Sequence, residues 1–255
     1  MEDAEVGEPV GGTIPHDAQL PNPGAMTART LRWHGGWARL GPWRGHEHVA
    51  YLAVGADVPP PREVVGECLE HMRADGFEDV VTSAMSPADS LAFVDAGFAV
   101  RERLYLLRHD MDVIPPVGRS LTRGRRSDHP GVLELDELAF DGFWHFDSTT
   151  LDDALRATPS TRFRLGVDDR GLRAYAISGR AGRQGYLQRL AVHPDARREG
   201  WGRDMVADSL AWLRRRGVDR TLVNTQLHNE AALQLYQDCG FRRLPFGLNV
   251  LGRAL

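Results

Sequence analysis

The stretch Gly185-Tyr-Leu-Gln-Arg-Leu-Ala-Val-His-Pro-Asp-Ala-Arg-Arg-Glu-Gly-Trp-Gly-Arg203 decides the fold of this chain. Residues 186–192 are largely apolar and suit a buried strand. Pro194-Asp195 ends that strand, because proline has no N–H for a ladder and the pair favours a turn. Apolar residues then recur at helical spacing from Met205 to Leu213. The stretch therefore predicts a strand, a glycine loop and the start of a helix.

The glycine loop has the chemistry of an anion site. A helix leaves its first N–H groups unpaired, and its dipole makes that end positive. Gly200 and Gly202 have no Cβ, so a phosphate can approach the backbone, and Arg197, Arg198 and Arg203 add positive charge. The chain contains neither G-x-G-x-x-G nor G-x-x-x-x-G-K-[ST], so a dinucleotide fold or a P-loop is poorly supported. The loop predicts a pyrophosphate-binding turn.

The arrangement Arg197-x-x-Gly200-x-Gly202 resembles the acetyl-CoA loop of the GCN5-related N-acetyltransferase (GNAT) family. Upstream, residues 190–192 look like the fourth strand of that family. Downstream, residues 229–241 look like its last cofactor-contacting helix, with the pattern N-x-x-A-x-x-x-Y-x-x-x-G-F intact. The resemblance implies an α/β fold with a mixed sheet, and acetyl-CoA as the cosubstrate with no metal.

The resemblance also implies which residues contact the cosubstrate. Backbone N–H groups of the fourth strand would polarise the thioester carbonyl where a bulge splays this strand from its neighbour, and such donors are typically worth about 3–4 kcal/mol in acyl transfer. Tyr236 resembles the general acid that protonates the departing thiolate, with a core tyrosine as the alternative. Asn229 looks like the residue at the pantetheine or the pyrophosphate. The implied cofactor-binding set is Leu190, Ala191, Val192, Arg197, Arg198, Glu199, Gly200, Trp201, Gly202, Arg203 and Asn229.

The general base is not identified. Many family members carry a glutamate on the fourth or fifth strand, where this chain has Tyr186 and Asn224. An amine of low pKa, such as a protein α-amino group near 7.7–8.0, needs little help to become neutral. Five polar residues stay open, the first two as groups that order a water: Gln188, Gln226, Glu134, Asp136 and Asp147.

The bulk composition limits the class of protein. The chain has 255 residues, enough for one large or two small domains, with 26% charged and 42% hydrophobic residues, as in soluble globular proteins. Its net charge of −4 gives no reason to expect nucleic acid as a partner. No apolar run approaches the ~20 residues of a membrane helix, and the start of the chain does not resemble a signal peptide. We expect a cytoplasmic protein without a membrane partner, as a monomer or a homodimer.

Cys68 and Cys239 form no metal or redox motif, and each fits a helical core position. Residues 1–28 are rich in Gly, Pro, Asp and Glu without periodicity and predict a disordered tail. From Leu31 the chain is rich in Trp and His at spacings that suit no zinc site, so we expect strand-face packing there. Residues 49–54 predict a strand.

An internal repeat organises the rest of the chain. Residues 62–76 align without gaps on residues 203–217, and both segments end in a glycine suited to a helix C-cap. In each copy a β-rich run follows, and then a helix that ends in Gly-Phe, at residues 97–98 and 240–241. Such self-similarity predicts a duplicated unit. We predict a truncated GNAT-like module over 29–112, a linker over 113–126 and a catalytic domain over 127–255.

The first copy has lost the residues that would bind a cosubstrate. It has Val58-Pro-Pro-Pro61 ahead of its helix, and three prolines offer no N–H groups to a phosphate. Ser86 stands at the place of Asn229, and Phe93 at the place of Tyr236. We therefore expect this half to be structural, packed on the active module or framing its substrate cleft.

Between the copies, the basic run Arg119–Arg126 fits a solvated linker better than a site for an acidic partner. Residues 131–140 and 151–157 predict helices, and residues 161–167 and 172–178 predict a hairpin. The aromatic residues at 143–146, between the helices, are expected to line an acceptor pocket or to fill the core, and the sequence leaves both open.

Two functions follow from these features. The first is an N-acetyltransferase that transfers acetyl from acetyl-CoA directly to an amine, on a small molecule or a protein N-terminus. No cysteine lies near the motif to form an acyl-enzyme. The second is an acyl-CoA-binding sensor or scaffold without turnover, which the missing carboxylate favours and the retained Tyr236 disfavours.

Overall fold

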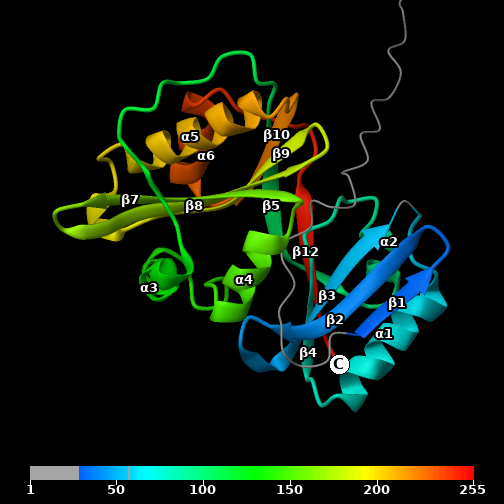
Figure 1. The fold of residues 1–255 in the computed structure, drawn as a ribbon. Coiled ribbons are helices and arrows are strands. Elements are labelled where there is room, and N and C mark those ends of the chain that lie inside the picture. The colour runs from blue at the N-terminus through cyan, green and yellow to red at the C-terminus, as the bar shows by residue number, and fades with distance from the viewer. Residues whose placement is uncertain (1–28, 57) are drawn as a thin grey trace, which may run out of the picture.

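The computed structural model describes residues 29–56 and 58–255, and the predicted tail over residues 1–28 lies outside them. One mixed sheet of twelve strands runs through the described part of the chain (Figure 1). The predicted α/β architecture is confirmed. The strands are β1 Arg29–Trp33, β2 Gly36–Trp43, β3 His46–Ala56, β4 Asp79–Thr82, β5 Ala99–His109, β6 Thr122–Arg123, β7 Ser160–Asp168, β8 Gly171–Ala181, β9 Gln184–Val192, β10 Arg220–Gln226, β11 Arg242–Arg243 and β12 Leu248–Ala254.

The helices pack on both faces of this sheet. In the C-terminal half, α5 and α6 share one core cluster with the sheet, and α3 and α4 share another cluster on the opposite face (Figure 1). Within residues 29–56 and 58–255, no helix is long and apolar enough to cross a membrane. The helices are α1 Arg62–Ala74, α2 Leu91–Asp95, α3 His129–Ala139, α4 Ser148–Arg156, α5 Trp201–Arg215 and α6 Glu230–Asp238.

The structure confirms the internal repeat. Helices α1 and α5 both end at a glycine with a left-handed backbone, Gly76 at φ +88° and Gly217 at φ +72°. In each copy the N–H that follows this glycine reaches back to close the helix, from Phe77 to the Met72 carbonyl and from Val218 to the Leu213 carbonyl. A second hydrogen bond runs from the glycine N–H itself, from Gly76 to the Arg73 carbonyl and from Gly217 to the Arg214 carbonyl. The two hydrogen bonds together form the Schellman C-cap, in which glycine avoids the clash of a Cβ.

The two halves exchange strands. β5 belongs to the first copy, yet it pairs along β10 of the second copy, from His109 opposite Thr221 to Leu104 opposite Gln226. β12, the last strand of the chain, lies between β5 and β4 of the first copy (Figure 1). One continuous sheet therefore joins the halves, and the boundaries at 29–112, 113–126 and 127–255 stay predictions.

The segment between β5 and β6 crosses the start of α5. The Gly118 N–H donates to Asp204 Oδ1 at 2.6 Å, and Arg119 Nη1 donates to Asp204 Oδ2 at 2.7 Å. Because the Asp204 side chain is only 8% exposed, these bonds are sheltered from water. Gly118 and Arg119 are therefore docked, where the sequence predicts a solvated linker.

Candidate functional site

The site begins where β9 parts from β10. The two parallel strands pair only at Gln184, Gly185 and Tyr186, and the rest of β9 has no partner in β10. On its other edge β9 carries a bulge at Gln188, because Leu187 pairs with Ser178 and Arg189 with Ile177. A bulge bends and twists a strand locally. The splay that the family resemblance requires is thus present, and it leaves the amides of residues 190–192 without partners in β10.

The glycine loop follows β9 and opens α5. Arg198 and Gly200 both have left-handed backbones, at φ +66° and +90°. The Asp204 N–H is the first of α5 to find its helical acceptor, the Gly200 carbonyl, at 3.1 Å. The amides of residues 201–203 precede it and have no acceptor within the helix, as at every helix start. The helix dipole adds partial positive charge at the same end.

Each glycine of the loop has its own structural reason. A Cβ at Gly202 would lie 2.9 Å from Leu235 Cδ2 and 3.7 Å from Val192 Cγ2. This glycine therefore lets α5 approach α6, and the room that it leaves for a phosphate stays a prediction. Gly200 is needed for its left-handed backbone, which other residues adopt at a cost.

Charged side chains surround the loop. The three predicted arginines are exposed, and no described carboxylate forms a salt bridge with them. Glu199 has a different role, because its carboxylate accepts from Arg170 Nη2 at 3.0 Å and from Trp201 Nε1 at 3.2 Å. The bond from Arg170 is the main cause that lowers the pKa of Glu199. The predicted arginines are Arg197, Arg198 and Arg203.

Sequence reasoning missed two arginines that hold this loop. Arg170 lies in the β7–β8 turn, and Arg119 lies before β6. The Arg119 guanidinium lies 4.6 Å from the ring centroid of Trp201 and donates to the Glu199 carbonyl at 2.6 Å. Neither residue has a local sequence signal, since each approaches the loop only through the tertiary fold.

Asn229 and Tyr236 lie on α6 as predicted. Asn229 caps the helix, because its Oδ1 accepts the Ala232 N–H at 3.0 Å. The Tyr236 ring is 94% buried and lies 5.8 Å from Phe241, as Phe93 lies 5.5 Å from Phe98 in the first copy. Burial raises the pKa of Tyr236, and the positive charge of Arg189 opposes part of that rise. The hydroxyl is therefore protonated at neutral pH, as a general acid must be.

A buried charge cluster lies on the α3 side of β9. Asp136 is fully buried and accepts from Arg189 at 2.8 and 2.6 Å, from the Phe146 N–H at 2.6 Å and from the Tyr175 hydroxyl. Arg189 also donates to the Trp144 carbonyl at 2.9 Å. Because both oxygens of Asp136 are occupied, this carboxylate holds the loop between α3 and α4 in place.

The N-terminal half reaches into this cluster. Arg44, in the β2–β3 turn, donates to the same Trp144 carbonyl, and its Nε finds no acceptor among the described residues. Burial and the neighbouring Arg189 lower the pKa of Arg44 to about 9. Two cations thus meet one carboxylate in the interior.

The aromatic residues of the α3–α4 loop form the contact between the halves. The Trp43 ring lies 5.5 Å from Phe143 and 5.6 Å from Trp144, and Trp43 Nε1 donates to the Phe143 carbonyl at 3.0 Å. Phe146 is only 4% exposed. Phe146 therefore packs in the core, whereas Phe143 and Trp144 are half-buried, and for them the alternative of an acceptor pocket stays a prediction.

Of the remaining candidates for the base or for ordering a water, only Asp147 has a structural role, and Gln226 lies half-buried at the end of β10. Asp147 caps α4, since its Oδ1 accepts the Thr150 N–H at 2.7 Å, and Glu134 is exposed on α3. Gln188 is the bulged residue, and its buried Oε1 has no partner in the part of the chain that the structure describes. The described residues also contain no group of three or more His, Cys, Asp and Glu that could hold a metal ion.

Residues 131–241 match the family model described as Acetyltransferase (GNAT) family. These residues form a GNAT acetyltransferase domain. The match takes in the splayed strand, the glycine loop and α6, so the predicted family is confirmed.

Two relatives extend the similarity beyond the GNAT domain. The mycothiol acetyltransferase of Rhodococcus jostii (strain RHA1) is 28% identical over 241 residues, which cover 82% of this chain and 76% of that protein. The mycothiol acetyltransferase of Salinispora arenicola (strain CNS-205) is 33% identical over 187 residues, which cover 64% of this chain and 59% of that protein.

A solved structure matches both halves. A tandem GNAT protein from the clavulanic acid biosynthesis pathway superimposes with a TM-score of 0.62 over 86% of this chain and 79% of that chain. Its sequence identity is 13%, so the likeness concerns the fold. It supports the arrangement of a GNAT domain beside a second, GNAT-like half.

Proposed function

We propose that this protein is an acetyl-CoA-dependent N-acetyltransferase that acts on a primary amine by direct attack in a ternary complex. The observation that carries the proposal is the parting of β9 from β10 directly beside the unpaired start of α5. A thioester in the splay would face the free edge of residues 190–192, while the pyrophosphate of the same molecule would bind the amides of residues 200–203.

The chemistry requires one bond to form and one to break. The amine nitrogen attacks the thioester carbon, the C–S bond breaks, and the thiolate accepts a proton from Tyr236. The attacking neutral amine loses one proton to solvent or to an unassigned base, and solvent returns a proton to Tyr236. Burial raises the pKa of Cys239 to about 11 and that of Cys68 to about 12, so neither thiol is poised to form an acyl-enzyme. This supports direct transfer.

Replacing Tyr236 by Phe tests the general acid. We expect kcat to fall by about 10²-fold, the lower end for general acid catalysis, with little change in acetyl-CoA affinity. Phe93 already occupies the equivalent place of the first copy in the same packing, so the variant should fold. Single-turnover measurement of CoASH release gives the rate. An unchanged rate would remove Tyr236 from this role.

The acceptor is proposed from the relatives. Both are named for mycothiol, so a small-molecule amine related to mycothiol is the first acceptor class to test, and a protein N-terminal amine is the second. Neither β9 nor β10 contains an Asp or Glu, which favours an amine of low pKa, because such an amine is neutral without a strong base.

The test combines calorimetry with an acceptor panel. Titration with acetyl-CoA should give a 1:1 isotherm, and CoASH release should depend on the amine added. The chain contains no lysine, so self-acetylation can occur only at its own α-amino group, and intact mass spectrometry detects it separately. Failure to bind acetyl-CoA would refute the proposal.

One observation favours a second function, an acyl-CoA sensor or scaffold. Asp136 and Asp147 are both committed to structural bonds, which leaves no assigned base and favours an acyl-CoA sensor or scaffold. Tight acetyl-CoA binding with no turnover on amines of pKa from about 7 to 10 would support the sensor instead of the enzyme.

A further inference from the structure

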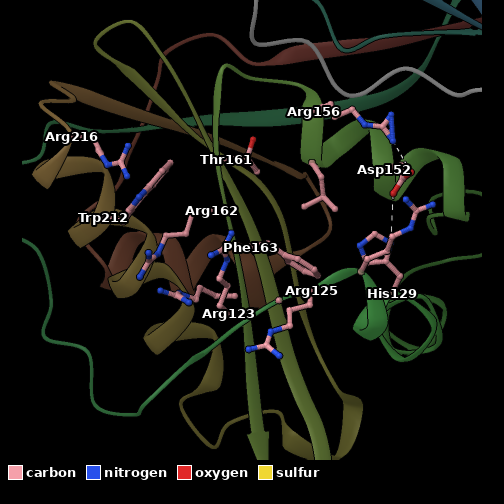
Figure 2. A pocket seen from close by; sticks show the side chains of 14 residues that line it. Arg123, Arg125, His129, Asp152, Arg156, Thr161, Arg162, Phe163, Trp212 and Arg216 are labelled. Atoms are coloured by element: carbon pink, nitrogen blue, oxygen red, sulfur yellow. Dashed lines mark hydrogen bonds and ion pairs between the residues drawn. The ribbon is translucent and has the colours of Figure 1, made fainter.

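A groove lined by arginines lies at the far end of α5 from the glycine loop. It has a volume of about 660 Å³ and wraps the sheet edge formed by β6 and β7 (Figure 2). α5 has 15 residues, so at 1.5 Å per residue its two ends are about 22 Å apart. The groove is therefore separate from the candidate acetyl-CoA site.

Arginines from four separate segments converge on this groove. Arg123, Arg125 and Arg126 come from the basic run before α3, and Arg156 ends α4. Arg162 and Arg164 come from β7, and Arg216 follows α5. Figure 2 shows side chains of these segments spread along the groove, with Trp212 and Phe163 among them. The basic run was predicted to be a solvated linker, because the other arginines lie far from it along the chain.

The positive charge in the groove is only partly neutralised. Asp152 is the one carboxylate among the lining residues, and it already pairs with Arg156 at 2.6 Å and with His129 at 3.5 Å. Outside the lining, Asp208 lies between Arg162, at 2.6 Å, and Arg164, at 3.8 Å.

Four arginines of the groove form no salt bridge within the described residues, although Arg156 and, more weakly, the nearby Arg126 lower the pKa of the Asp152 carboxyl. Arg123, Arg125, Arg126 and Arg216 make no salt bridge with any described carboxylate. In addition, the buried Nε of Arg164 has no acceptor within residues 29–56 and 58–255. Burial and the neighbouring arginines also lower the pKa of Arg164, as expected where like charges crowd. An anion would relieve this repulsion and satisfy the free donors.

We infer that this groove binds a compact polyphosphorylated small molecule. Guanidinium groups match the oxygen pairs of phosphate with two parallel hydrogen bonds, and several of them are needed for a ligand with three or more charges. The volume falls in the ordinary range for small-molecule sites. An extended nucleic acid is disfavoured, because the chain as a whole carries a net charge of −4 and a pI near 6.2. The inference does not depend on acetyltransferase activity.

The test is calorimetric titration with inorganic tripolyphosphate, with and without saturating CoA to occupy the glycine loop. The groove variant is Arg123→Gln/Arg125→Gln, whose side chains are exposed. The matched control is Arg62→Gln/Arg73→Gln on α1, which removes the same charge from an exposed surface elsewhere.

We expect 1:1 binding that persists with CoA present, weakens at least tenfold in the groove variant, and stays within twofold in the control. A 20-nucleotide single-stranded RNA provides the second arm. The inference is overturned if tripolyphosphate does not bind, if CoA abolishes its binding, or if both variants weaken it equally. It is also overturned if RNA binds the groove more tightly than tripolyphosphate does. The acetyl-CoA titration of the groove variant should match that of the parent, so failure here is distinguishable from failure of the proposed enzyme.

Discussion

Replacing Asp136 by Ala should destabilise the protein strongly. The carboxylate accepts four hydrogen bonds, two of them from a guanidinium whose side chain is only 10% exposed. Its removal leaves Arg189 buried without a counter-charge, beside a second buried cation, Arg44. Breaking such a pair from one side typically costs about 3–5 kcal/mol, and the second cation places this case near the upper end. For a chain of this size that loss corresponds to a fall in Tm of about 10 °C or more.

Urea unfolding, followed by tryptophan fluorescence, measures this loss. The informative comparison is the double variant Asp136→Leu/Arg189→Met, which removes both charges and fills the space with apolar groups. Apolar replacement of a whole buried pair is often neutral or stabilising, so this variant should recover part of the free energy lost in Asp136→Ala, although Arg44, the Phe146 N–H and the Tyr175 hydroxyl still lack the carboxylate. The reasoning fails if Asp136→Ala unfolds within about 1 kcal/mol of the parent, or if the double variant is less stable than the single one.

Three further predictions concern pH, packing and the loop. Burial raises the pKa of Asp153 to about 6, so the folded state holds this proton more tightly than the unfolded state does, and the free energy of unfolding falls as pH rises from about 4 to 6. Asp153→Asn should therefore raise the free energy of unfolding at pH 7 by on the order of 1 kcal/mol after solvent screening, and leave it unchanged below pH 4. Urea titrations at both pH values measure the difference. Gly202→Ala should weaken acetyl-CoA binding about tenfold by pushing α5 from Leu235, whereas Gly131→Ala, where a Cβ meets nothing within 4 Å, should bind like the parent in calorimetry. Arg119→Met should raise the acetyl-CoA Kd several-fold with little change in Tm, and a Kd within twofold of the parent would show that this arginine does not hold the loop.

The sequence predicted the parts of the site that are local. The strand, loop and helix from 185 to 215 follow from apolar runs, prolines and glycines that act on near neighbours, and the C-caps at Gly76 and Gly217 follow from the same local rules. The exchange of β5 and β12 was not predictable in this way. Either pairing satisfies the apolar pattern of the strands, so only the fold as a whole selects one.

Contacts between side chains of distant segments could not be predicted from the sequence either. Arg119 and Arg170 carry no motif, and they reach Glu199 only because separate loops meet there. The direction of the missing Cβ at Gly202 likewise depends on where α6 packs. Asp136 was predicted as a possible general base, because its hydrogen bonds from Arg189 to both carboxylate oxygens form only in the folded protein.

The exchanged strands explain why a copy without a cosubstrate loop is retained. β5 of that copy pairs along the edge of β10 that faces away from β9, so it supports β10 from behind where β10 parts from β9. Deleting the N-terminal half would remove the neighbour of β10 and expose a row of unpaired N–H and C=O groups, which promotes aggregation. Because strands of both halves alternate in one sheet, removing either half would leave strands of the other without their hydrogen-bonding neighbours.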